Sequence, residues 1–140
     1  MKIFLSFILI SVTAWSWSHH IDQRDQSNTS RQVIAVHPIE LKKDMDPIVF
    51  EQYVNTEIAP ICNKIEGLQF MLVKGDRGSR INKYAIILTF ATIEDRNRVY
   101  PYGEESREDW GPNEIWERFA SMASGLGDES SFVDYVEIPN

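Results

Sequence analysis

The segment from Lys83 to Phe90, KYAIILTF, restricts the fold more than any other part of the chain. Its β-branched and aromatic residues predict a strand, and strand side chains alternate between two faces. Apolar side chains dominate both faces, with Tyr84, Ile86, Leu88 and Phe90 on one and Ala85 and Ile87 beside Thr89 on the other. The segment Leu68 to Val73, LQFMLV, also predicts a strand with apolar side chains on both faces. Because a sheet that is apolar on both faces is buried on both, this sheet needs two covers.

Apolar periodicity and capping signals divide the rest of the chain into helices and strands. Asp46-Pro47 predicts a helix start, Pro60 predicts a kink, and Gly67 predicts a left-handed stop. Cys62 lies on the apolar stripe of that helix, which favours a core role over a reactive thiol. In order, the elements are strand 33–41, helix 47–67, strand 68–73, strand 83–90, a short helix from Thr92 to before Pro101, a helix opened by Pro112 and closed by Gly125, and strand 132–138.

This order is βαββαβ, which predicts an α+β fold of the ferredoxin-like plait. The predicted domain covers residues 33–140, with a four-stranded antiparallel sheet and all helices on one face. The helices then cover one side of the sheet, and the rest of the chain offers too little sequence for a second layer. We therefore expect a second subunit to cover the other side, giving a homodimer.

The first eighteen residues have the pattern of a secretory signal peptide. Lys2 precedes a nearly continuous apolar run from Ile3 to Ala14, and small residues at Ser16 and Ser18 fit a cleavage site. Cleavage is expected after Ser18, with the bond after Ser16 as second choice and an uncleaved anchor as the alternative. The mature protein is then secreted or periplasmic, with no membrane segment, because no later segment reaches the length of a span.

Residues 19–32 are polar and predict a flexible tether. His19 and His20 at a new N-terminus are two solvated residues or, alternatively, ligands of copper or nickel. Asn28 begins a glycosylation sequon, which matters only in a source that glycosylates. The single cysteine excludes an internal disulfide framework.

Charge and motifs exclude several classes of protein. The net charge of −7 argues against nucleic-acid binding and against attraction to anionic lipid. The segment GDRGSR lacks the phosphate-loop and dinucleotide patterns. Zinc-ligand spacing and a nucleophile elbow are absent from the sequence, and the acidic residues lack the spacing of a calcium loop. We expect no metal and no cofactor.

Seven residues are candidates for a site. His37, on the first strand, has the pKa range of a general base, although hydrogen bonding to a neighbour is its structural alternative. Gln69, Met71 and Thr89 can share one face of the sheet, which His37 joins if the register allows. Polar groups among apolar residues form either a satisfied network or a ligand site, and the sequence leaves both open.

The other three candidates lie in and after the short helix. Arg96 and Tyr100 can bind an anionic or aromatic ligand, or Arg96 can instead pair with Glu94 or Glu104 at the surface. Trp110 can line the mouth of a pocket. Trp116 fits the apolar stripe of its helix and is expected to pack in the core. Together the seven residues make up the predicted site, with His37 as the catalytic candidate and the other six as ligand-pocket candidates.

The chain resembles the dimeric α/β-barrel superfamily, which includes the EthD-like, NIPSNAP, stress-responsive barrel and antibiotic-biosynthesis monooxygenase proteins. The resemblance covers about Val33 to Ile138 and rests on the element order, on PIVFEQYVNTEIAPICNKIEGLQ, on KYAIILTFATIEDRNRVYP and on the terminal DYVEI. It implies two sheets facing each other across a dimer. The haem-binding helix histidine and the second cyclase histidine have no match here.

Two functions follow from these observations. The first is an exported homodimeric α/β-barrel protein of unknown activity that binds a small apolar or aromatic ligand or a protein partner. The alternative is a cofactor-free enzyme of the oxygenase, cyclase or isomerase kind, with His37 as general base.

Overall fold

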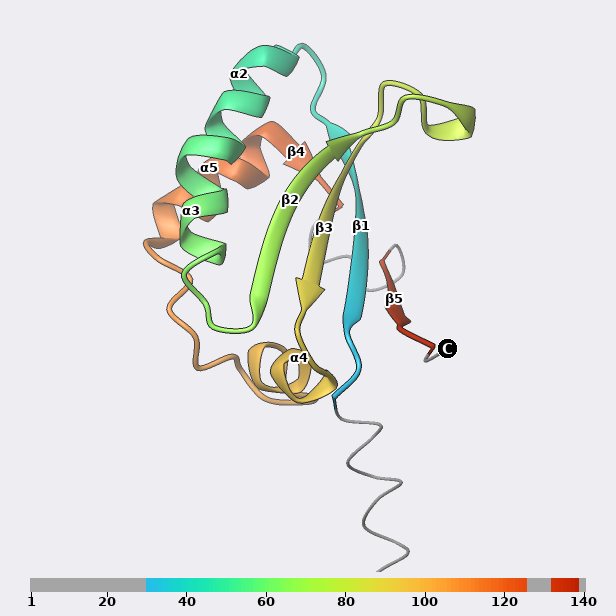
Figure 1. Ribbon diagram of the computed structural model, residues 1–140. Helices are drawn as coiled ribbons and strands as arrows, with labels where there is room; N and C mark the ends of the chain where they lie inside the picture. Colours follow the sequence, from blue (N-terminus) through green and yellow to red (C-terminus); the bar gives the residue numbers. More distant parts are fainter. Residues whose placement is uncertain (1–29, 126–131, 139–140) are drawn as a thin grey trace, which may run out of the picture.

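The computed structural model describes residues 30–125 and 132–138 (Figure 1). The predicted signal peptide (1–18), most of the predicted tether (19–32), His19, His20 and the Asn28 sequon lie outside the described residues. Within them, no helix is long and apolar enough to cross a membrane.

The described chain forms strands and helices in the expected order. The strands are β1 (Val33–Leu41), β2 (Leu68–Lys74), β3 (Tyr84–Phe90), β4 (Ala123–Ser124) and β5 (Val133–Val136). The helices are α2 (Pro47–Tyr53), the π-helix η1 (Val54–Ile58), α3 (Ala59–Cys62), the 3₁₀ turn η2 (Gly78–Arg80), α4 (Ile93–Val99) and α5 (Asn113–Met122).

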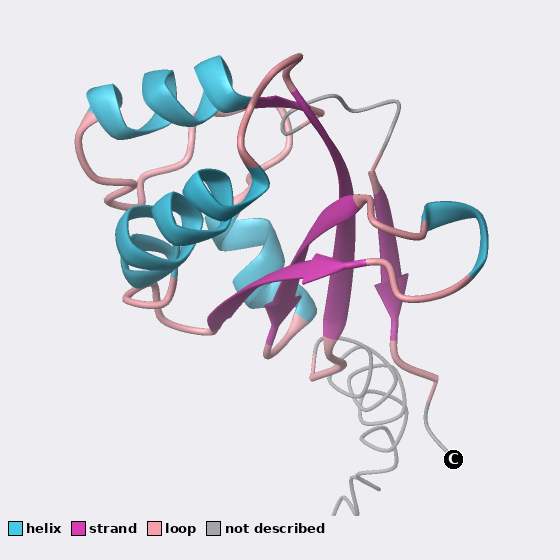
Figure 2. Ribbon diagram, turned by 90° about the horizontal axis from the view of Figure 1, so that it is seen from above, coloured by secondary structure: helices cyan, strands magenta, loops and turns pink. Residues whose placement is uncertain are grey.

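The sheet is antiparallel and has the strand order of the ferredoxin-like plait. β3 lies between β2 and β1, and the far edge of β1 pairs with both β5 and β4. The helices gather on one side of the sheet, and no described α-helix covers the other (Figure 2). This arrangement confirms the predicted α+β fold.

The C-terminal part of the fold differs from the sequence prediction in two details. The last helix ends at Met122, and the two-residue strand β4 follows because Ala123 is buried against β1, where it pairs with Leu41. The last strand is shorter than the predicted 132–138. The extent of such short strand pairings depends on where the connecting loops bring the chain next to β1. Residue periodicity does not predict this position.

The first helix is interrupted by a π turn immediately before Pro60. Proline has no N–H to donate, and the N–H of Ala59 donates to the carbonyl of Val54, five residues back. The predicted disturbance at Pro60 therefore takes the form of a π turn, and the helix ends at Cys62. Gly67 has a φ of +74°, in agreement with the predicted left-handed position, and a Cβ there would meet the Asp95 side chain.

The core fills the space between the helices and one face of the sheet. Cys62 is 1% exposed in this core, and burial raises the pKa of its thiol to about 12, which agrees with the predicted packing role. The strands contribute Val33, Ala35, Ile39, Leu68, Phe70, Tyr84, Ile86, Leu88 and Phe90, and the helices contribute Phe50, Val54, Ile58, Val99, Phe119 and Met122.

Candidate functional site

The face of the sheet away from the helices is apolar and open to solvent; we call it the open face. Directly opposed residues in antiparallel strands share a face, so the register assigns its members. Three rows of side chains cross it: Gln69–Thr89–Ile34–Tyr135, Met71–Ile87–Val36–Val133, and Val73–Ala85–Pro38. Met71 is 50% exposed and Tyr135 is 57% exposed. None of these described side chains is charged.

Gln69, Met71 and Thr89 lie together on the open face, as predicted. Gln69 and Thr89 are directly opposed across β2 and β3, and Met71 opposes Ile87 in the next row. The two polar side chains therefore sit side by side at one end of an otherwise apolar surface.

His37 lies on the other face, so the suggested grouping with Gln69 and Thr89 is wrong. Its directly opposed residue on β3 is Ile86, which is fully buried under the helices. Ile34, three residues before His37, pairs with Thr89 and faces the open side. Because strand residues an odd number apart face opposite ways, His37 points toward the helices.

The imidazole of His37 is buried against an aromatic ring. It is 8% exposed and stacks on the Phe132 ring, with centroids 4.9 Å apart and an interplanar angle of 18°. Its Nδ1 has no hydrogen-bond partner among the described residues. The structural alternative predicted a hydrogen bond between His37 and a neighbour, and Nδ1 does not make one within the described residues.

Burial lowers the pKa of His37 below its usual value of 6.5, and the nearby charge of Asp134 opposes this shift. The unfolded chain then binds a proton near pH 6.5 while the folded chain does not, so protonation favours unfolding. We expect the contribution of His37 to stability to be complete above pH 6.5 and to be lost as pH falls through the folded pKa. Urea unfolding of the wild type and of His37→Phe, at pH 7.5 and at about pH 5.5, tests this.

The variant should lose less stability than the wild type over that interval. A titration of the imidazole by NMR gives the sign directly, and a pKa above 6.5 would contradict the expectation.

Arg96, Tyr100 and Trp110 lie on the helix side and do not join the open-face residues. Arg96 pairs with Asp134 on β5, rather than with Glu94 or Glu104 as the surface alternative predicted. Tyr100 packs against Trp110, with ring centroids 5.5 Å apart, and burial raises its pKa. The Trp110 indole donates to Ser106 Oγ at 3.1 Å. The seven candidates therefore do not form one pocket.

The rings of Tyr100 and Trp110 belong to a chain of aromatic contacts. It continues through the half-buried Trp116 to Phe119, Phe50 and Tyr84, with neighbouring centroids 5.3 to 6.3 Å apart. Trp116 thus packs against the core, as predicted. These aromatic contacts join α5, α2 and β3 into one packed unit.

The segment 100–112, which connects α4 to α5 and is rich in acidic residues, is held to α4 by charge pairing. Arg98 pairs with both Glu108 and Asp95, and its guanidinium also donates to the carbonyl of Glu66. Nowhere in 30–125 or 132–138 do three histidine, cysteine, aspartate or glutamate side chains gather as metal ligands would.

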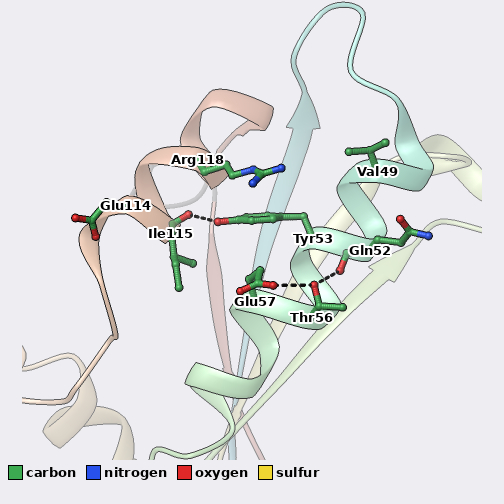
Figure 3. A pocket seen from close by; sticks show the side chains of 8 residues that line it. All are labelled: Val49, Gln52, Tyr53, Thr56, Glu57, Glu114, Ile115 and Arg118. Carbon is green, nitrogen blue, oxygen red and sulfur yellow. Dashed lines mark hydrogen bonds between the residues drawn. The ribbon is translucent and has the colours of Figure 1, made fainter.

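A hollow of about 550 Å³, which no sequence pattern predicted, lies between the first helix and α5 (Figure 3). Tyr53 crosses it, with its hydroxyl donating to the carbonyl oxygen of Ile115 at 2.7 Å. The Arg118 guanidinium lies over the Tyr53 ring, 4.8 Å from its centroid. The lining residues are Val49, Gln52, Tyr53, Thr56, Glu57, Glu114, Ile115 and Arg118. The sequence feature that could have indicated this hollow is Tyr53, a polar aromatic residue next to the apolar stripe of the first helix.

Comparison with known proteins finds only remote structural likeness, of which one example follows. No protein-family model and no curated protein matches the chain. A crystal structure from Bacteroides fragilis, described as a dimeric protein of unknown function with a ferredoxin-like fold, is 14% identical and has a TM-score of 0.44. The match covers 74% of this chain and 94% of that one. A likeness this remote says nothing about function or assembly, and the resemblance to particular barrel families stays a prediction.

Proposed function

We propose that the protein is an exported homodimer in which the open faces of two copies pack against each other as a dimeric α/β barrel. The observation that carries this proposal is the uncharged, apolar open face. Soluble monomers rarely expose a large contiguous apolar patch. Export rests on the signal-like residues 1–18 and is part of the same proposal.

Charge restricts where two copies can meet to the open face. The full chain has a net charge of −7, and the chain from His19 has 13 − 21 = −8 because Lys2 is removed, so two copies repel each other over most of their surfaces. The open face is where they can approach without opposing like charges. At one end it is bordered by Glu40, which pairs with Lys83 at 3.4 Å and with Arg80 at 3.8 Å. An apolar centre with a polar rim is the usual anatomy of an interface.

A ligand site between the two sheets follows from Gln69 and Thr89. In the dimer these side chains become enclosed, and enclosed polar groups need hydrogen-bond partners. A small apolar or aromatic molecule with one polar group fits a chamber with apolar walls and an amide and a hydroxyl at one end. Polar contacts across the dimer axis are the alternative, in which the interior is filled by protein.

The test is the mass of the purified protein. Intact mass spectrometry of protein isolated from its native compartment identifies the N-terminal residue, which we expect to be His19. Light scattering should then give twice that chain mass. A monomer would overturn the dimer and would point to another protein as the cover of the open face.

A second candidate function is cofactor-free catalysis with His37 as general base. Its support is a buried imidazole whose Nδ1 has no partner within the described part of the chain, and whose lowered pKa keeps the ring in its basic form at neutral pH. The experiment is a turnover assay on His37→Gln, with dimer mass as the folding control. Turnover that survives this substitution would remove His37 from the mechanism.

A further inference from the structure

The turn that joins β2 to β3 lies on the open-face side of the sheet. It spans residues 75–83 and contains η2, and we call it the arm. Figures 1 and 2 show η2 on the opposite side of the sheet from α2, α3 and α5. Glu40 shares the open-face side with Pro38, because strand residues two apart point the same way. Since Arg80 Nη1 of the arm lies 3.8 Å from Glu40 Oε1, the arm leans over one end of the open face.

The arm has a fixed shape, because its own hydrogen bonds hold it. The N–H of Gly75 donates to the carbonyl of Lys83 at 2.8 Å, and the N–H of Asn82 donates to the carbonyl of Gly75 at 2.8 Å. The Arg80 guanidinium donates to the carbonyl of Tyr84 at 2.9 Å. A Cβ on Gly75 would lie 1.8 Å from the Arg80 carbonyl oxygen, so the two limbs of the arm are in contact there. A loop that is ordered beforehand loses less entropy when it binds another molecule.

Two side chains of the arm are largely exposed in the single chain. Ile81 is 56% exposed and does not belong to the hydrophobic core. The Arg77 side chain is 93% exposed, and the ion pair recorded for it is with the adjacent Asp76, whose side chain is 90% exposed. The arm follows directly after β2, where Val73 is exposed on the open face. An isolated exposed isoleucine is ordinary, but Ile81 adds to an apolar surface that the sheet already presents.

The arm is basic, whereas the chain as a whole is acidic. Residues 75–83 contain Arg77, Arg80 and Lys83 against Asp76, which gives a charge of 3 − 1 = +2. Arg80 and Lys83 share the carboxylate of Glu40, so the arm and Glu40 together still have a charge of 2 − 1 = +1. The full chain has a net charge of −7. A second copy therefore attracts the arm, although it repels most of the remaining surface.

We propose that in the dimer the arm of each copy contacts the other copy beside the open face. Ile81 packs against an apolar part of the second copy, and Arg77 pairs with one of its carboxylates. The inference rests on the proposed dimer, because a second copy seated on the open face brings another surface within reach of the arm. A two-fold axis forms the contact twice, once with each arm.

The test is photocrosslinking from the tip of the arm. Ser79→Cys carries a maleimide benzophenone at an exposed position of η2, and Cys62 does not compete for the label because it is buried. Mixing isotopically light and heavy chains separates crosslinks between copies from those within one chain. Ser79→Cys should crosslink the two copies, whereas Ser121→Cys, at an exposed position of α5 on the helix side, should not.

The mass of the labelled sample distinguishes the two ways in which this experiment can fail. Crosslinks confined to one chain in a sample of dimer mass would overturn the arm contact and leave the dimer standing. A sample of monomer mass would overturn both proposals and would make another protein the occupant of the open face.

A double variant measures what the contact contributes to association. Arg77→Glu with Ile81→Ser should weaken dimerisation at least about tenfold in sedimentation, and the fold should persist because both side chains are exposed. Arg107→Glu with Ile48→Ser makes the same changes at exposed residues of the α4–α5 connection and of α2, and should dimerise as the wild type does. An arm variant that dimerises as tightly as the wild type, or an equal loss in both double variants, would overturn the arm contact.

Discussion

Met71→Glu should convert the proposed dimer into a monomer whose fold is intact. Met71 is half-exposed on β2, so the substitution costs the single chain little. In the dimer the same position is enclosed, and a two-fold axis places the new carboxylate in the interface twice. Burying an unpaired charge is costly, and the two copies together should weaken association at least about 100-fold. Sedimentation over a range of protein concentrations measures this.

Asn55→Glu is the matched control for this prediction. It adds the same charge at an exposed residue of η1, on the helix side of the sheet. The control should remain dimeric, because its added charge lies outside the proposed interface on the open face. Loss of the dimer in both variants would mean that total charge controls assembly, and a dimer that survives Met71→Glu would place the interface elsewhere.

The two faces of each strand could be predicted from the sequence, because alternate residues of a strand point to opposite sides. Leu68, Phe70 and Leu72 separate from Gln69 and Met71 by position alone. Which face of one strand joins which face of another depends on the register of pairing, and register is set by the turns and by the helix cover. His37 was grouped with Thr89 for this reason, although Ile34 is the residue that opposes Thr89.

The helix-side features were harder to predict because they join residues distant in sequence. Arg96 was expected to find a carboxylate near its own helix, but its partner Asp134 is 38 residues away. The Tyr53 hollow likewise needs α5 beside the first helix, with Arg118 brought over a ring 65 positions earlier in the chain. Periodicity locates a buried stripe but does not identify the neighbour that covers it.

Phe50→Ala should destabilise the fold by about 3–5 kcal/mol, the usual cost of removing a buried phenylalanine ring. Phe50 is 0% exposed and lies where α2 meets both the sheet and α5. Its ring centroid is 5.3 Å from that of Tyr84 and 6.0 Å from that of Phe119. The substitution therefore opens a cavity between three elements at once, and the rigid helix layer cannot readily collapse into it. Urea unfolding at one fixed protein concentration measures the change.

Tyr102→Ala is the control for loss of an aromatic ring, because Tyr102 is fully exposed and its removal should change stability by less than about 0.5 kcal/mol. Phe50→Leu leaves a smaller cavity and should cost about half as much as Phe50→Ala. Both Phe50 variants should be compared in the Met71→Glu background as well, since the stability of a dimer depends on its concentration. A cost that falls below about 1 kcal/mol there would mean that the Phe50 ring fills a dimer-dependent core rather than the core of the single chain.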